Sequence, residues 1–109
     1  MTSITIKRKH KDIIGYTVEG HTGFGTEGED IVCAAVSSLS TATLNGLTDV
    51  VGLTVGYEVR EAYLTCILPD TMSEKEAAGA KVLLNTMYLS LKDLEEQYGK
   101  YITITELEV

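Results

Sequence analysis

The sequence predicts one α+β domain over residues 1–109, with a mostly antiparallel sheet that carries two helices. Segments with the two-residue period of strands and segments with the helical period follow one another in the order ββαββαβ. No internal repeat or linker interrupts them, and 109 residues are enough for one modest core. Hydrophobic residues make up 44% of the chain and charged residues 23%, which is the balance of an ordinary soluble globular protein.

The first two strands are predicted over residues 3–9 and 13–19, because apolar and polar residues alternate in both. The two strands are expected to form a hairpin. A basic cluster at residues 7–11 is predicted to be its solvated turn, with a docking patch for RNA or an acidic partner as the alternative. The predicted buried face of the second strand consists of Ile14, Tyr16 and Val18.

The first helix is predicted from Asp30, a favourable N-cap residue, through an uncharged run that ends at Thr48. Serine, threonine and asparagine side chains make this run too polar for a membrane-spanning helix. Its apolar residues cover so much of the helix surface that we expect other elements to enclose it on several sides. Those at helical spacing are Val32, Val36, Leu39, Leu47 and Val50.

A second hairpin is predicted from a strand over residues 53–59 and another over 62–68. A short polar break at Arg60 and Glu61 separates the two strands. Cys66 falls on the apolar side of the fourth strand, so we expect it to be a small core residue.

The second helix is predicted to begin with a capping box formed by Ser73 and Glu76. Gly99 is its predicted C-terminal stop, since glycine is the usual residue just beyond a helix end. The last strand is predicted over residues 101–105.

The formal net charge of −7 repels the phosphate backbone of nucleic acids, and direct nucleic-acid binding is not expected. Residues 1–12 are charged where a signal peptide is apolar, so the cytoplasm is the expected compartment. Cys33 and Cys66 have no zinc-finger spacing and are expected to be free thiols. No cofactor and no metal are expected.

Residues 23–28 match the GxGxxG pattern of dinucleotide-binding folds, with an acid, Asp49, at about the expected distance of 20 residues. We reject this interpretation, because the acids before the first helix would repel a pyrophosphate there. The chain also lacks the repeated βαβ units of that fold. The acids are Glu27, Glu29 and Asp30.

His21 and Cys33 suggest a nucleophilic thiol. A thiol attacks as its thiolate, so its ordinary pKa of about 8.5 must fall for activity at neutral pH. If Asp30 is the N-cap, Cys33 lies in the first helical turn, where the helix dipole and the His21 imidazole both favour the thiolate. Plain packing of Cys33 and a metal site remain open as alternatives.

The stretch from Gly20 to Ser40, GHTGFGTEGEDIVCAAVSSLS, resembles the signature of the ribosomal-processing cysteine protease family, called Prp. The length and the ββαββαβ order agree with that family over essentially the whole chain. The resemblance implies a bacterial cytoplasmic cysteine endopeptidase that forms homodimers. Its family substrate is ribosomal protein L-twenty-seven of the large subunit, whose short N-terminal extension is removed by cleavage after aromatic residues.

The resemblance also implies the roles of individual residues. Cys33 is the expected nucleophile and His21 the expected base, and Gly20, Asp30 and Ser37 occupy accessory positions. Asp30 either orients His21 or only caps the helix, and the backbone N–H of Cys33 is expected to help bind the oxyanion. Two rival functions remain: a non-catalytic ribosome-assembly or binding module, and a thiol redox or metal protein.

Overall fold

The structure, a computed structural model, describes residues 1–20 and 27–109, and the side chains of residues 1–20 and 30–109. Its elements follow one another in the predicted order ββαββαβ, with a short π-helical turn, η1, that extends the first helix. They are β1 (Thr2–Lys9), β2 (Asp12–Glu19), α1 (Glu27–Asn45), η1 (Gly46–Val50), β3 (Gly56–Arg60), β4 (Tyr63–Ile67), α2 (Glu74–Tyr98) and β5 (Ile102–Glu108).

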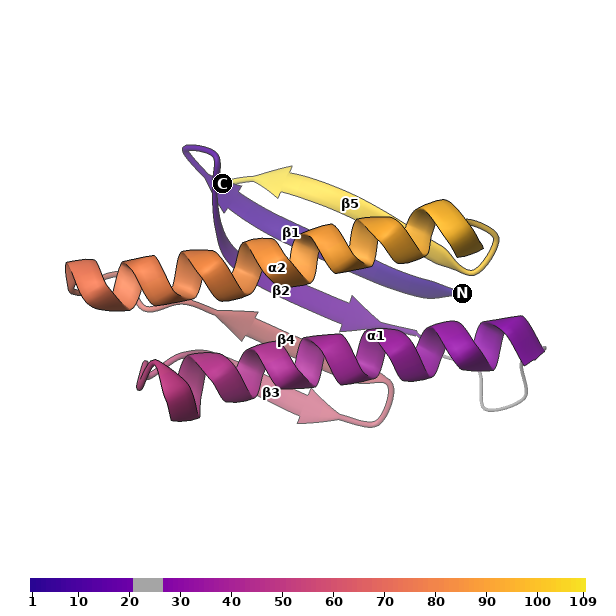
Figure 1. Ribbon diagram of the computed structural model, residues 1–109, viewed down its shortest axis with the longest axis horizontal. Helices are drawn as coiled ribbons and strands as arrows, with labels where there is room; N and C mark the ends of the chain where they lie inside the picture. Colours follow the sequence, from indigo (N-terminus) through magenta and orange to yellow (C-terminus); the bar gives the residue numbers. More distant parts are fainter. Residues whose placement is uncertain (21–26) are drawn as a thin grey trace.

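The five strands form one sheet in the order β3-β4-β2-β1-β5 (Figure 1). Every neighbouring pair is antiparallel except β1 and β5, which run parallel. This confirms the mostly antiparallel α+β class. A sheet with one parallel pair also lacks the repeated βαβ units of a dinucleotide-binding fold. Residues 23–26 of the GxGxxG pattern lie outside the described residues.

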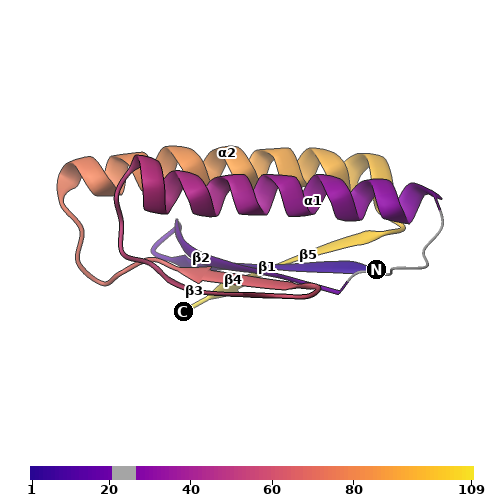
Figure 2. The same ribbon diagram turned by 90° about the horizontal axis from the view of Figure 1, so that it is seen from below.

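Both helices cover the same face of the sheet, and no helix or strand of the described residues covers the opposite face (Figure 2). The core lies between the two layers and includes fully buried residues from the strands and both helices. On the open face, Thr5 pairs with Thr17, and Thr17 pairs with Thr65, so threonines lie side by side across three strands. The Thr17 and Thr65 hydroxyl oxygens are 2.8 Å apart.

The prediction that other elements enclose α1 on several sides is wrong. Val32, Val36 and Leu47 are fully buried, but Ile31 is 51% exposed and Val50 in η1 is 83% exposed. Because both helices lie on one face of the sheet, α1 packs through one side and leaves the other side open.

The stretch Asp30–Val50 is long and apolar enough to cross a membrane by length and composition alone. The core helix of a globular domain passes the same test, so this is weak evidence for a membrane span. Here Val32, Val36 and Leu47 pack into the core of the domain, which is the behaviour of such a core helix.

A bulge in the first hairpin corrects the predicted face of β2. Lys7 pairs with Gly15 and Arg8 with Ile13, which leaves Ile14 as an extra residue between two pairs. The extra residue reverses the alternation, so Ile13 is buried in the core and Ile14 is only partly buried.

The tips of the two hairpins each have two residues. His10 and Lys11 have φ angles of 50° and 75°, and the pairing of Lys9 with Asp12 closes a tight turn. Positive φ at both central residues is the signature of a type I′ turn, whose twist matches that of paired strands. The second hairpin is closed by the pairing of Arg60 with Tyr63, so its break lies at residues 61–62, one position later than predicted.

The third strand is shorter than its sequence pattern. Leu53 and Val55 alternate with polar neighbours and are buried, but they lie in the connection before β3. Burial against the core therefore produced the two-residue period without strand pairing. The N–H of Leu53 donates to the carbonyl of Leu47 at 2.9 Å, which ties this connection to η1.

The capping box at the start of α2 is confirmed. The Ser73 hydroxyl accepts a hydrogen bond from the Glu76 N–H at 3.1 Å, and the Glu76 carboxylate accepts from the Ser73 N–H at 2.8 Å. The helix ends before Gly99, as predicted, but Gly99 has a right-handed φ of −57°. It is therefore not the left-handed stop that glycine usually supplies.

Candidate functional site

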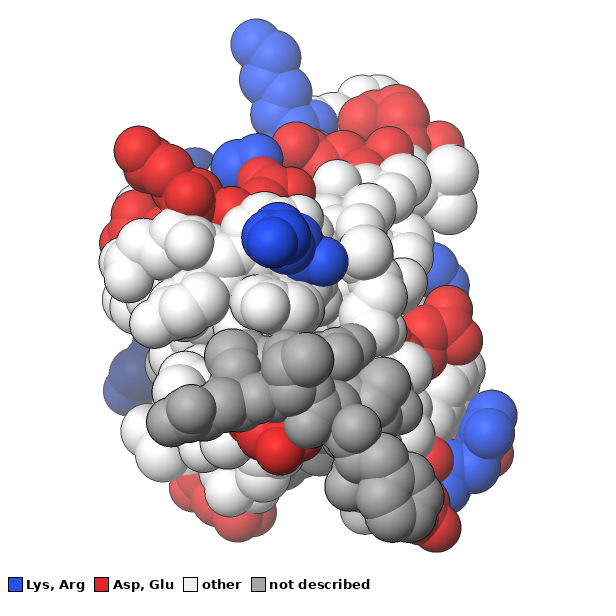
Figure 3. All heavy atoms as spheres, turned by 90° about the vertical axis from the view of Figure 1, so that its right-hand side faces the viewer, with Lys and Arg blue, Asp and Glu red and all other residues white. Residues whose placement is uncertain are grey.

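Cys33 lies in α1 on the side that faces the β3–β4 hairpin, and it is half-buried with a free thiol. It lines a cavity of about 310 Å³ between α1 and this hairpin. Figure 3 shows the end of the molecule at which α1 begins, where acidic side chains gather along the top of the view and a basic side chain stands near its centre. A half-buried thiol beside a cavity can reach a bound molecule.

The cavity has an uncharged wall and an apolar wall. On α1, Ala34, Ser37 and Thr41 continue the wall that Cys33 begins, and Val59 and Leu64 form the wall from the hairpin. Such a surface suits an apolar side chain that is flanked by a peptide backbone.

A cation–π pair also lines the cavity. The Arg60 guanidinium carbon lies 3.9 Å from the centre of the Tyr63 ring. Arg60 is the charged residue among the described residues that line this cavity. The pair places a broad planar group next to the apolar wall.

The helix start corrects the expected environment of Cys33. Helix α1 begins at Glu27, so Asp30 is not its N-cap and Cys33 is not in its first turn. Acidic residue types are favourable in a first helical turn, which is compatible with helix before Asp30. The effect of the dipole falls off within that turn, so it contributes little at Cys33.

The same helix start removes an expected oxyanion donor. Only the first four N–H groups of an α-helix lack a partner within the helix. Cys33 is further along, so its N–H is used in the helical hydrogen-bond pattern. The expectation that this N–H binds an oxyanion is therefore wrong.

Gly20 has a clear structural requirement. Its φ is +80°, and a Cβ placed there would lie 2.8 Å from the carbonyl oxygen of Met1. Its N–H donates to the carbonyl of Ala62 at 3.1 Å, in the turn of the β3–β4 hairpin. Gly20 therefore fixes the point at which the chain leaves β2 beside the Cys33 cavity.

The other predicted site residues have different outcomes. His21 lies outside the described residues, and its role as the base stays a prediction. Ser37 lines the same cavity as Cys33, as its position one helical turn later predicts. Asp30 is exposed on α1.

Sequence reasoning missed Thr2. The Thr2 Oγ1 lies 3.6 Å from the Cys33 Sγ, and Thr2 lines the same cavity. The signal was present in the alternation of β1, where Thr2 occupies the same face as Ile4 and Ile6. A polar residue in a row of buried apolar residues indicates a specific partner.

Cys66 is a core residue, as predicted. It is fully buried in β4, and burial raises the pKa of its thiol to about 11. The neighbouring Tyr16 hydroxyl donates to the carbonyl of Ser40 at 2.8 Å, which closes this part of the core. A thiol so buried cannot resolve a disulfide with Cys33 without local opening, which weakens the redox interpretation.

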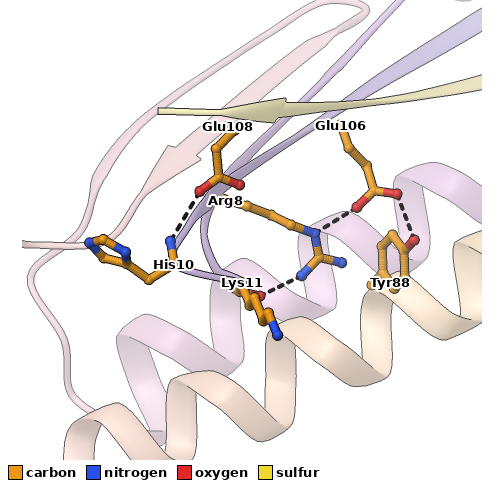
Figure 4. A network of polar contacts seen from close by, with 6 residues as sticks. All are labelled: Arg8, His10, Lys11, Tyr88, Glu106 and Glu108. Carbon is orange, nitrogen blue, oxygen red and sulfur yellow. Dashed lines mark hydrogen bonds and ion pairs between the residues drawn. The ribbon is translucent and has the colours of Figure 1, made fainter.

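Two residues of the basic cluster at residues 7–11, Arg8 and His10, are bonded to acids of β5 (Figure 4). The Arg8 Nε lies 2.6 Å from the Glu106 carboxylate, whose other oxygen accepts a hydrogen bond from Tyr88 at 2.9 Å. The His10 N–H donates to Glu108 at 3.1 Å. These contacts hold a solvated hairpin turn in place and favour that interpretation over a docking patch.

No group of three or more His, Cys, Asp or Glu side chains that could hold a metal ion occurs among the described residues. Cys33 has Thr2 as its described polar neighbour, and a hydroxyl is a poor companion ligand for zinc.

The whole chain is similar to known proteins. The family model "Cysteine protease Prp" matches residues 1–103. The Bacillus subtilis protein "Ribosomal processing cysteine protease Prp" is 27% identical over 108 residues, which cover 96% of each chain.

Solved structures share the fold. The SMU.848 protein of Streptococcus mutans superposes with a TM-score of 0.85 and 27% identity, over 100% of this chain and 96% of the other. The Prp protease of Staphylococcus aureus in complex with a substrate peptide gives a TM-score of 0.85 at 21% identity, over 97% and 99% of the two chains. Because the family model matches residues 1–103, nearly the whole chain, this chain belongs to the cysteine protease Prp family.

Proposed function

We propose that this chain is a cysteine endopeptidase that removes the short N-terminal extension of ribosomal protein L-twenty-seven, cutting after aromatic residues. The observation that carries the proposal is the half-buried Cys33 thiol on the wall of a cavity whose described lining is mostly uncharged. Membership of a cysteine protease family and the names of the Bacillus and Staphylococcus relatives support ribosomal processing.

Cys33 acts as the nucleophile and His21 as the general base. His21 takes the thiol proton, and the sulfur attacks the scissile carbonyl carbon to form a tetrahedral intermediate. The C–N bond then breaks, and His21 returns the proton to the leaving amine. A water molecule, deprotonated by His21, hydrolyses the thioester, which releases the new carboxylate and restores the thiol.

The cavity beside Cys33 receives the aromatic side chain before the cut. Its apolar wall, Val59 and Leu64, and the planar Arg60–Tyr63 pair suit an aromatic ring. β3 is one of the two edge strands, β5 being the other, so one side of its backbone can pair with an extended peptide.

Exposed side chains extend this surface along β3. Tyr57 and Val59 are 62% and 58% exposed although they share the face of the buried Leu64 and Cys66. Apolar side chains left open along an edge strand favour an apolar partner strand.

The proposed enzyme works in the cytoplasm, where ribosomal precursors are made, and as a homodimer. Sedimentation velocity at micromolar concentration tests the second point, with a sedimenting mass of two chains expected. A species of one chain at every concentration would contradict the dimer.

A peptide that spans the ribosomal extension tests the activity. Wild type is expected to cut it after the aromatic pair, and Cys33→Ala and His21→Ala are expected to lose at least a thousandfold in kcat/KM. Ser38→Ala, on the exposed surface of α1 outside the cavity, is the matched control and is expected to keep wild-type activity.

Equal cleavage by wild type and Cys33→Ala would remove the protease proposal. Binding of the peptide by all variants without any cleavage would instead support the non-catalytic binding module.

A further inference from the structure

The buried face of β1 is apolar except at its first residue. Thr2, Ile4 and Ile6 point to the helices, and they are 2%, 1% and 0% exposed. Valine has nearly the shape of threonine and would continue the row without a polar atom. A hydroxyl buried at this depth is unfavourable unless it forms a hydrogen bond.

Thr2 differs from the other buried polar residues of the described chain, which are Ser40 and Thr43. The Ser40 hydroxyl donates to the carbonyl of Val36, and the Thr43 hydroxyl to that of Leu39, both at 2.8 Å. These two are satisfied by the backbone of their own helix. The hydroxyl of Thr2 is 3.6 Å from the Cys33 sulfur, its polar partner within the described part of the chain.

The backbone holds this hydroxyl in place. The Thr2 N–H donates to the carbonyl of Tyr101 at 2.9 Å, and Thr2 pairs with Ile102 of β5. The start of β1 is therefore held against β5 and against the residues that connect α2 to β5. Because the Thr2 side chain is β-branched and buried, its hydroxyl has little freedom to turn away from the sulfur.

We propose that Thr2 is a positioning residue whose hydroxyl donates a hydrogen bond to the thiolate of Cys33. In the thiol form either atom can be the donor. Once the sulfur has lost its proton, only the hydroxyl carries a hydrogen, and the bond becomes charge-assisted. A hydrogen bond that is stronger to the ionised form favours that form.

This inference rests on the proposed role of Cys33. The hydrogen bond from Thr2 takes the place of the helix dipole, which was expected from the sequence to stabilise the thiolate. The charged and titratable side chains that face the cavity are Arg60 and Tyr63 of the hairpin, and Asp30 lies three residues earlier on α1. Thr2 supplies a donor directly to the sulfur.

The test is the rate of Cys33 alkylation by iodoacetamide from pH 5 to 9, read by mass spectrometry in the intact protein. Thr2→Val is expected to shift the profile to higher pH by about one unit, a tenfold loss of reactive thiolate below its midpoint. Thr2→Ser keeps the hydroxyl and is expected to restore the wild-type profile. Thr5→Val, on the open face of the sheet, is the control and is expected to change nothing.

A Thr2→Val profile that superimposes on wild type in a folded protein overturns the proposal. So does a loss of peptide cleavage with an unchanged alkylation profile, because the hydroxyl then acts on the substrate. If no variant cuts the peptide but the profile still shifts, the inference about Thr2 stands and the proposed protease function fails.

Discussion

The two cysteines of this chain have opposite environments. Cys33 is half-buried beside a cavity, whereas Cys66 is enclosed in the core, where burial raises the pKa of its thiol to about 11. Burial disfavours the charged thiolate because it removes the solvation of the anion. The same residue type is thus accessible beside a cavity at one position and enclosed in the core at the other.

We predict selective alkylation in the native protein. Iodoacetamide at pH 7 is expected to modify Cys33 at least a hundredfold faster than Cys66, because Cys66 is both shielded and protonated. Peptide mapping after timed quenching measures both rates. In urea, where the protein is unfolded, the two alkylation rates should converge. Faster alkylation of Cys66 than of Cys33 in the native protein would contradict the environments described for the two thiols.

A second residue-scale prediction concerns Gly20. Gly20→Ala is expected to destabilise the fold by about 2–3 kcal/mol, since it combines a positive φ with a steric clash against the Met1 carbonyl. Gly52→Ala is the matched control, because Gly52 has a φ of +86° with open space around it. It should cost about 1 kcal/mol, from the backbone conformation alone.

Urea unfolding of both variants measures the difference. Equal losses of unfolding free energy in the two variants would show that the steric clash with the Met1 carbonyl contributes nothing at Gly20.

At the scale of elements, features formed by residues close in the sequence could be predicted, whereas the register of strand pairing and contacts between distant segments could not. The capping box of Ser73 and Glu76 could be predicted because its partners are three residues apart. The bulge at Ile14 could not, since it depends on how β1 pairs with β2. Nor could Thr2 be linked to Cys33, because that contact joins the start of β1 to a helix thirty-one residues later.

The tip of the first hairpin gives an element-scale prediction. His10 and Lys11 adopt positive φ angles that Asn and Gly adopt at lower cost. The double substitution His10→Asn and Lys11→Gly is expected to stabilise the protein by about 1 kcal/mol. The His10 N–H bond to Glu108 is a backbone bond and is retained.

Thermal unfolding at pH 7 tests this, with a rise in Tm expected. The control replaces both residues with alanine and is expected to leave the Tm no higher than that of wild type. A lower Tm for the Asn-Gly variant would rule out a type I′ turn.

For the whole molecule, a polar network joins three elements. Glu106 of β5 accepts hydrogen bonds from Arg8 of β1 and Tyr88 of α2, and the Arg8 guanidinium carbon lies 4.8 Å from the centre of the Tyr88 ring. These partners lower the pKa of Glu106, the bond from Arg8 most strongly. The network lies at the surface, so water screens its contribution.

The lowered pKa of Glu106 predicts a pH dependence of stability. A carboxyl whose folded pKa lies below its unfolded value of about 4.3 stabilises the fold above that value. The contribution is lost as the pH falls through the folded pKa. Glu106→Gln should therefore lower stability at pH 7 and weaken the fall in stability below about pH 4.3.

Urea midpoints from pH 2.5 to 7 measure this, with Glu96→Gln, at an exposed position of α2, as the charge-matched control. Parallel curves for wild type and Glu106→Gln across the acid range would show that the network is not coupled to folding.

In the proposed function, the Cys33 thiolate is the nucleophile that cuts the ribosomal precursor. The most direct measurement follows peptide cleavage and the extent of Cys33 alkylation in the same sample during slow iodoacetamide treatment at pH 7. We predict that activity falls in proportion to the modified fraction of Cys33, with Cys66 unmodified throughout. Full alkylation of Cys33 with cleavage undiminished would contradict the account.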